Sequence, residues 1–229
     1  MRIYINLEEC FRETERDLKE MGIIYVSETV QDKVKKVNTI ELNNYGYTLI
    51  DPDYREVLGV AGKQGINLVW LRAEASERGY FSLKQKNPNP AYRKNLKFWK
   101  PFLRDGCFSY TYPERLHPQI DRVIHELKIR PNTRQAVLTL YDWHQDIMNL
   151  GGRDRIPCSM YYQFLIRKGK LHCSYTMRSC DLYKFFLSDV ALAIYLMTKI
   201  AECVNRPIGN FTHFIGSLHA FESELEGVF

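Results

Sequence analysis

The sequence lacks several features that would assign the protein to a familiar class. Its six cysteines form no CxxC pair, and none stands at zinc-ligand spacing from a histidine, which excludes a zinc ribbon. No apolar run is long enough to span a bilayer. Charges run through residues 1–18, where a signal peptide needs an apolar core. We therefore expect a cytoplasmic protein with reduced thiols and no membrane segment.

A strong excess of charge of one sign is also missing. The chain has 32 Lys and Arg against 27 Asp and Glu, a net charge of +5. Basic residues are mixed with acidic ones, as in residues 13–17 (ETERD), which is typical of a solvated helix face. We expect no direct nucleic-acid binding, although a small anion such as a nucleotide phosphate needs only a few cations.

Enough hydrophobic sequence is present for one substantial core. The chain has 229 residues, of which 45% are hydrophobic, so we expect a single domain over residues 1–229. Segments with helical spacing alternate with segments rich in β-formers, which predicts an α+β fold with a large mixed β-sheet packed with helices. The expected helices cover residues 7–21, 66–71, 120–127 and 190–204, the strands 39–42, 135–141, 160–167 and 171–177, and a loop 84–104.

The most informative segment is a predicted hairpin. Residues 160–167 and 171–177 are β-rich and are joined by a short turn that contains Gly169. Cys158 precedes the first strand, and Arg178-Ser179-Cys180-Asp181 follows the second. An antiparallel hairpin therefore brings a thiol, a guanidinium and a carboxylate to one end of the sheet. Because a reactive thiolate needs nearby positive charge, Arg178 is the expected partner of Cys158.

A lone cysteine in a cytosolic chain is more often an inert, buried side chain than a nucleophile. Here the order and spacing of Cys158 and Arg178 with Gln163, Asp189 and His219 make the pattern specific. With these residues, the sequence resembles the core of the thymidylate synthase superfamily, which includes the phage deoxycytidylate hydroxymethylases.

The resemblance is strong over residues 158–221 and weaker over 38–70 and 110–141. It implies a thymidylate synthase-like fold, a homodimer formed sheet to sheet, a pyrimidine nucleoside monophosphate as substrate, and 5,10-methylenetetrahydrofolate or a related pterin as cofactor. It also implies that Cys158 attacks C6 of the pyrimidine, which turns C5 into a carbanion-like centre that can accept a one-carbon unit.

The resemblance further implies roles around the substrate phosphate. Arg178 would bind the phosphate as well as support the thiolate, since its planar fork suits phosphate oxygens, and Ser179 would add a hydrogen bond. Arg134 matches an arginine that reaches the phosphate of the partner subunit. Gln135 replaces a second arginine of the family, so the phosphate site would rely on cations at Lys33, Lys35 or Lys36.

Other matches concern the base, the sugar and the pterin. Gln163 would support the base, and Asp181 and Trp70 would lie on the pterin side. His219 would contact the sugar 3′-hydroxyl, but Phe221 replaces the tyrosine that helps it, which removes one hydrogen bond. The predicted residue behind the nucleophile is Tyr110.

Asp189 bears on the choice of base. Thymidylate synthases have asparagine at the matching position, whereas deoxycytidylate hydroxymethylases have aspartate, which accepts a hydrogen bond from the cytosine amino group. Cytosine N3 is an acceptor, so complete pairing needs a protonated carboxyl or a bridging water. The resemblance therefore favours CMP or dCMP over UMP or dUMP. The alternative interpretation is an aspartate that stabilises the first turn of a helix.

The sequence departs from the family in two places. Asn67 stands where the family has a glutamate that handles protons, and an asparagine cannot act as a general base. Glu74 is displaced by one turn or more. The sequence ends at Phe229, before the tail that closes over folate in typical members, so we expect a looser folate site.

Three functions remain open at this stage. The first is a one-carbon transferase, most simply a (deoxy)cytidylate 5-hydroxymethyltransferase, because water rather than a reductant completes that reaction. The second is a thymidylate synthase, with a different pterin or reductant. The third is a nucleotide-binding homologue without turnover, which Asn67 favours and Cys158 opposes.

Overall fold

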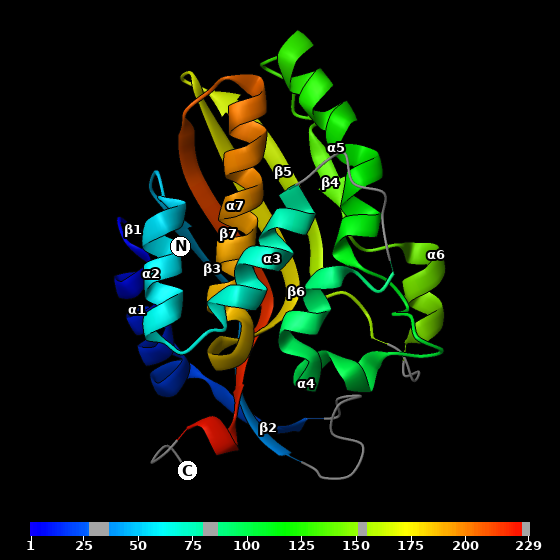
Figure 1. The fold of residues 1–229 in the computed structure, drawn as a ribbon. Helices are drawn as coiled ribbons and strands as arrows, with labels where there is room; N and C mark the ends of the chain where they lie inside the picture. The colour runs from blue at the N-terminus through cyan, green and yellow to red at the C-terminus, as the bar shows by residue number, and fades with distance from the viewer. Residues whose placement is uncertain (28–36, 80–86, 151–154, 226–229) are drawn as a thin grey trace.

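The computed structural model describes residues 1–27, 37–79, 87–150 and 155–225. A single mixed sheet runs through the molecule, and α7, α3 and α5 lie in front of it in Figure 1. The strands are β1 Arg2–Tyr4, β2 Ile23–Ser27, β3 Val37–Leu49, β4 Val137–Thr139, β5 Ser159–Arg167, β6 Lys170–Asp181 and β7 Ile208–Phe221.

The longer helices carry the apolar residues that cover the sheet. They are α1 Leu7–Met21, α2 Tyr54–Lys63, α3 Leu68–Gly79, α5 Tyr112–Ile129 and α7 Leu187–Val204. Shorter helical segments are α4 Leu96–Trp99, α6 Trp143–Asp146, Pro90–Asn95, Lys100–Phe102, Ile147–Asn149, Leu182–Phe186 and Glu222–Glu224. In the described part of the chain, no helix combines the length and the hydrophobicity needed to cross a membrane.

The sheet has seven strands in the order β1-β3-β7-β6-β5-β4, with β2 paired to β3. The β1–β3 and β6–β7 pairs are parallel, and the others are antiparallel. Helix α7 connects the parallel strands β6 and β7, as a crossover between parallel neighbours requires. This mixed architecture confirms the predicted fold class.

The predicted hairpin of β5 and β6 is present. Lys168 and Gly169 form its two-residue turn, and both have positive φ, of 49° and 76°. Such a turn matches the twist of the flanking strands. The pairing places Ser159 opposite Met177, so Cys158 and Arg178 lie side by side just beyond this pair, as predicted.

Aromatic rings form a continuous layer on the buried face of the central strands. The rings of Tyr162 and Tyr175 are stacked with centroids 4.3 Å apart, and His213 stacks on Tyr175 at 4.9 Å. All three side chains are fully buried. The Tyr47 hydroxyl lies 3.0 Å from His213 Nδ1. Burial lowers the pKa of His213 to about 3.

The opposite face of the sheet is less covered. Side chains alternate along β5 and β7, with one set buried under the helices and the other partly open. Tyr161 and Phe214 belong to the open set and are 40% and 43% exposed. This face therefore presents aromatic and polar side chains to the surroundings.

Two predicted boundaries need correction. Residues 84–104 were expected to form a loop, but the described part of this segment contains short helical turns over Pro90–Asn95, Leu96–Trp99 and Lys100–Phe102. The strand expected over 135–141 is shorter, since β4 covers only Val137–Thr139. The candidate phosphate ligands at 33, 35 and 36 lie outside the described residues.

Candidate active site

Cys158 lies at the start of β5 next to the guanidinium of Arg178. Arg178 Nη2 donates toward Cys158 Sγ at 3.9 Å, and the Arg178 amide donates to the Cys158 carbonyl at 2.8 Å. The Arg178 side chain is fixed by two further carbonyls, Pro157 at 2.9 Å and Ile156 at 3.1 Å. The hairpin register thus holds the thiol beside a cation whose orientation is set by the backbone.

The electrostatics around the thiol act in opposite directions. Burial raises the pKa of Cys158, whereas Arg178 and, more weakly, Arg155 lower it. Asp189 and Asp181 raise it further. The net effect is a thiol with a pKa above its ordinary value. A ligand anion placed between the thiol and Arg178 would alter this balance.

Arg155 is a functional candidate that the sequence did not reveal. Its guanidinium lies 4.6 Å from the Trp99 ring, 4.9 Å from the Phe102 ring and 6.0 Å from the Tyr110 ring. It lowers the pKa of both Cys158 and Asp189, so it belongs to the same site. Its position three residues before Cys158 in the sequence is the feature that could have identified it as a candidate.

Tyr110 has its ring centroid 6.0 Å from this arginine. It is 9% exposed, and its hydroxyl is buried without a hydrogen-bond partner in the described structure. Burial raises its pKa well above the ordinary value. The Arg115 guanidinium also packs on its ring, 4.3 Å from the centroid. Tyr110 therefore stays neutral and can offer a hydroxyl to a ligand.

Asp189 lies in the first turn of α7 and is oriented toward the site. Cys180 Sγ is 4.0 Å from Asp189 Oδ2, and the carboxyl acts electrostatically on Cys158. Burial raises the pKa of Asp189 to about 7, although Arg78 and Arg155 lower it. At neutral pH the carboxyl is therefore present in both its neutral and ionised forms.

The neighbouring strands supply the residues predicted for the sugar and the pterin. Ser179 Oγ lies 3.5 Å from His219 Nδ1 across the parallel β6–β7 pair. The His219 and Phe221 rings are in edge contact at 5.4 Å. Asp181 caps the next helical turn by accepting from the Tyr183 and Lys184 amides at 3.1 and 3.0 Å. Burial raises the pKa of Asp181, and Lys184 opposes this effect.

Three predicted residues are not brought to Cys158. Asn67 is exposed and caps α3, accepting from the Trp70 amide at 3.0 Å and donating to the Lys94 carbonyl at 3.0 Å. Gln163 lies five residues along β5 and donates to the Arg134 carbonyl at 3.0 Å. At about 3.3 Å per residue, this places Gln163 and the exposed Arg134 roughly 16 Å from the thiol.

Trp70, predicted on the pterin side, is 6% exposed and lies 6.1 Å from the Trp99 ring. The Nε1 atoms of both indoles are buried without a hydrogen-bond partner in the described structure. The same region contains a buried carboxylate and guanidinium, Glu74 and Arg78, joined at 2.9 Å. The spacing of apolar residues in this segment did not predict that the two charged side chains would be buried together.

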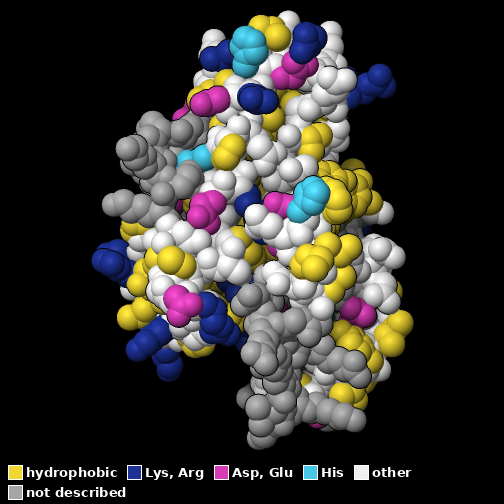
Figure 2. Space-filling view, turned by 90° about the vertical axis from the view of Figure 1, so that its right-hand side faces the viewer, with side chains coloured by type: hydrophobic (Ala, Val, Ile, Leu, Met, Phe, Trp, Pro, Cys, Tyr) yellow, Lys and Arg dark blue, Asp and Glu magenta, His cyan; other side chains and the backbone are white. Residues whose placement is uncertain are grey.

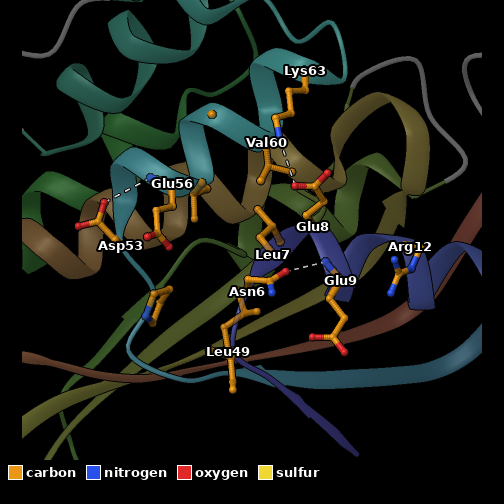
Figure 3. A pocket seen from close by; sticks show the side chains of 14 residues that line it. Asn6, Leu7, Glu8, Glu9, Arg12, Leu49, Asp53, Glu56, Val60 and Lys63 are labelled. Atoms are coloured by element: carbon orange, nitrogen blue, oxygen red, sulfur yellow. Dashed lines mark hydrogen bonds and ion pairs between the residues drawn. The ribbon is translucent and has the colours of Figure 1, made fainter.

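A separate pocket of about 560 Å³ lies between α1 and α2 and contains none of the predicted site residues (Figure 3). Its ionic groups are partly paired with each other, as Lys63 and Glu8 are at 3.1 Å. Among the described residues, no group of three or more histidine, cysteine, aspartate or glutamate side chains could hold a metal ion. The chemistry is concentrated around Cys158.

The surface in Figure 2, on the side of α5 and α6, shows no basic stripe. Lys and Arg side chains are spread over this face, with Asp and Glu side chains among them. Hydrophobic side chains also reach this surface. Trp143 and Met148, in and just after α6, are 64% and 81% exposed. This distribution is consistent with the charge mixing seen in the sequence.

Comparisons with known proteins agree with the geometry. The family model of thymidylate synthase matches residues 62–229. The chain belongs to the thymidylate synthase family. It is 30% identical to the thymidylate synthase of Buchnera aphidicola over 152 residues, which is 66% of this chain and 50% of the relative.

A second sequence relative and a solved structure are also similar to this chain, and the solved structure supports the fold alone. A Methanocaldococcus jannaschii protein that is provisionally named a thymidylate synthase is 34% identical over 140 residues, which is 57% of this chain and 61% of that protein. The solved structure of thermostable thymidylate synthase A from Bacillus subtilis has a TM-score of 0.73 at 18% identity and covers 96% of this chain and 82% of that one. The aligned regions span about half to three fifths of the two sequence relatives.

Proposed function

We propose that this protein transfers a one-carbon unit to C5 of a pyrimidine nucleoside monophosphate, and that Cys158 is the nucleophile. The observation that carries the proposal is the 3.9 Å approach of Arg178 Nη2 to the thiol at the end of the hairpin. Family membership and the position of Asp189 at the same site support it. The leading reaction is 5-hydroxymethylation of CMP or dCMP.

In the proposed mechanism, the Cys158 thiolate forms a bond to C6 of the base, and the C5–C6 π electrons move onto C5 and its conjugated substituent. C5 would then bond to the one-carbon unit and lose its hydrogen as a proton, with the pterin amine as the leaving group. Water would add to the resulting exocyclic methylene to give the hydroxymethyl group, and the electron pair returned to the ring would expel the thiolate from C6 and restore the double bond. Arg178 stabilises the thiolate before attack and after release, and can also bind the substrate phosphate.

A reduced pterin fits the aromatic surface beside the thiol. The rings of Trp70, Trp99 and Phe102 lie side by side, with centroid distances of 6.1 and 6.2 Å. The unpartnered Nε1 groups of the two tryptophans could donate to pterin acceptors. When bound, 5,10-methylenetetrahydrofolate or a related pterin would supply the one-carbon unit. Arg155 would have to share or leave its place against Trp99.

Asp189 is the residue we propose for base choice. A neutral carboxyl both donates and accepts, so it matches cytosine N3 and the cytosine amino group together. A carboxyl with a pKa of about 7 provides this form at and below neutral pH. The same neutral form can also pair with uracil, and the names of the relatives keep methylation of dUMP as the second candidate.

Release of tritium from C5 of labelled dCMP, CMP, dUMP and UMP tests the proposal, since it reports attack at C6 before any transfer. We expect release to be fastest with a cytidylate and to fall at least 10³-fold, an order-of-magnitude estimate, in Cys158→Ala. The Asp189→Asn variant should shift the preference toward the uracil nucleotides. Cys203→Ala is the matched control because this thiol is exposed at the far end of α7.

The outcomes separate the candidate functions. Unchanged release in Cys158→Ala would contradict covalent attack. Fastest release from dUMP would move methylation to first place. Binding of nucleotides without any release in the unmodified protein would favour a nucleotide-binding homologue without turnover.

A further inference from the structure

Helix α3 contains an ion pair that is removed from solvent. Glu74 is 7% exposed and Arg78 is 4% exposed, and Arg78 Nε donates to Glu74 Oε1 at 2.9 Å. Burying two charges costs desolvation energy that their attraction does not reliably offset, so such a pair is weak evidence for a stabilising role. Stability alone therefore does not explain the burial of this pair.

The carboxylate of this pair has hydrogen-bond partners for both oxygens, whereas one nitrogen of the guanidinium has none in the described structure. Glu74 Oε2 accepts from Asn89 Nδ2 at 3.0 Å, so both carboxylate oxygens are engaged. The Arg78 guanidinium lies 4.5 Å from the Tyr112 ring, and its Nη1 is buried without a hydrogen-bond partner in the described structure. A buried cationic donor without a partner calls for an acceptor that the site or its ligand provides.

The Tyr112 ring against which Arg78 lies connects the pair to the candidate active site. The Tyr112 hydroxyl accepts from the Ser159 amide at 3.4 Å, and Ser159 directly follows Cys158. Arg78 acts on Asp189 more strongly than any other neighbouring cation does, and Glu74 acts on it in the opposite direction. The titratable and charged groups around Asp189 are Glu74, Arg78, Arg155, Cys158, Cys180, Asp181, Tyr47, Tyr112, Tyr162 and Tyr175.

We propose that the buried Glu74–Arg78 pair is a positioning element of the pyrimidine site, in which Arg78 controls the charge on the Asp189 carboxyl and Glu74 holds Arg78 in place. The inference rests on the proposed function insofar as Asp189 reads the base. Asn67 caps a helix and is exposed, so it cannot perform this task. Glu74 lies seven residues further along, two turns later on the same side of the helix.

The pair has a direct consequence for recognition. An ionised carboxylate only accepts hydrogen bonds, whereas a neutral carboxyl also donates one to cytosine N3. The positive charge of Arg78 favours the ionised form, and the negative charge of Glu74 favours the neutral form. Removing one charge or the other should therefore move the titration of Asp189 in opposite directions.

The test is a ¹³C NMR titration of side-chain carboxyls in the nucleotide-free protein, with the Asp189 signal assigned by its loss in Asp189→Asn. We expect Glu74→Gln to lower the midpoint of Asp189 and Arg78→Met to raise it, each by roughly half a pH unit or more. Arg78→Lys, which keeps the charge, should restore most of the original midpoint.

Glu77→Gln is the matched control. Glu77 lies one turn along the same helix and also accepts from Asn89, but the ion pair of Arg78 in the described structure is with Glu74. If Arg78→Met does not fold, the double variant Glu74→Gln/Arg78→Met removes both charges and should titrate at a higher pH than Glu74→Gln does. An unchanged Asp189 midpoint in Glu74→Gln, or an equal shift in Glu77→Gln, overturns the proposal.

Calorimetric titration of dCMP over the same pH range separates this inference from the proposed function. The pH dependence of binding should shift with the same sign as the Asp189 midpoint. A shifted carboxyl with unshifted dCMP binding would support the link between the pair and Asp189 and would overturn the role of Asp189 in reading the base.

Discussion

At the scale of single residues, the site contains two groups whose charge depends strongly on their surroundings. Cys158 is partly exposed and lies next to Arg178, and the pKa of its thiol is raised by burial. Asp189 lies between arginines and acids, and its pKa is raised to about 7, again by burial. Changes in pH near neutrality therefore affect the carboxyl before they affect the thiol.

The raised pKa of Asp189 makes a prediction about stability. Because the folded state binds a proton that the unfolded state releases near pH 4, this residue stabilises the fold at low pH and loses that contribution as the pH rises toward 7. From pH 5 to 7, the free energy of unfolding should fall relative to Asp189→Asn by about 1.4 kcal/mol per pH unit at most. Urea unfolding at several pH values measures this difference.

An exposed aspartate provides the control for this experiment. Asp121→Asn removes the same kind of charge from the surface of α5 and should leave the pH dependence unchanged. Parallel curves for the unmodified protein and Asp189→Asn would contradict the burial of the Asp189 carboxyl. Because both variants keep the other titrating groups, such as His213, the difference between their free energies of unfolding cancels the contributions of those groups.

At the scale of elements, the contact between α3 and α7 holds Arg78 over the site. Gly79 ends α3, and a Cβ atom at this position would lie 2.6 Å from Tyr195 Cε1 and 3.1 Å from Lys199 Cγ. Tyr195 in turn packs on Tyr54, with ring centroids 4.9 Å apart. The absence of a side chain at Gly79 thus permits the close approach of the two helices.

We therefore expect Gly79→Ala to destabilise the protein, although alanine favours helices by about 1 kcal/mol over glycine. Overpacking against Tyr195 costs about 1–3 kcal/mol, so the net loss should be about 0–2 kcal/mol. Gly59→Ala in α2 is the control, because its Cβ meets no atom within 4 Å and the variant should gain stability. Urea unfolding of both variants compares them, and a stabilised Gly79→Ala would contradict this packing.

The sequence predicted the elements that have strong periodicity or clear terminators. The helix over residues 7–21 ends at Gly22 and the hairpin turns at Gly169, as expected from the spacing of apolar residues and the position of glycine. The relation of Cys158 to Arg178 followed from the hairpin alone. It could be predicted because short-range pairing determines it.

Contacts between distant segments could not be predicted in this way. Arg155 reaches Trp99, and the Glu74–Arg78 pair reaches Asp189, only because separate elements pack together. The role expected for Asn67 came from its position relative to a motif of the family. In the structure its side chain caps a helix. Local sequence does not distinguish a capping asparagine from one that points into a site.

At the scale of the whole molecule, the partly open sheet face is the surface on which the expected homodimer would form. Arg134 lies roughly 16 Å from the thiol of its own chain by strand spacing, so it could serve a phosphate site only in a partner subunit. Tyr161 and Phe214 give the open face the aromatic character of an interface core. We therefore propose that each site combines residues of two subunits.

Mixing two inactive variants tests this proposal. Cys158→Ala and Arg134→Ala should each lose activity alone, and random mixed dimers should recover about a quarter of it, since half of the dimers are hybrids with one intact site of two. Sedimentation should show dimers that Phe214→Glu weakens. Absence of recovery in mixtures shown to exchange subunits would exclude a composite site.

The order of elements has a further consequence for folding. Strand β6, helix α7 and strand β7 follow one another directly in the chain, and the candidate residues Arg178, Ser179, Asp181, Asp189 and His219 all lie on them. Closing this unit involves short loops and therefore little loss of chain entropy compared with pairing β7 to the distant β3. Most of the chemistry can thus be assembled early and locally, while Tyr110, Trp70 and the α3 ion pair join it only when the rest of the chain docks.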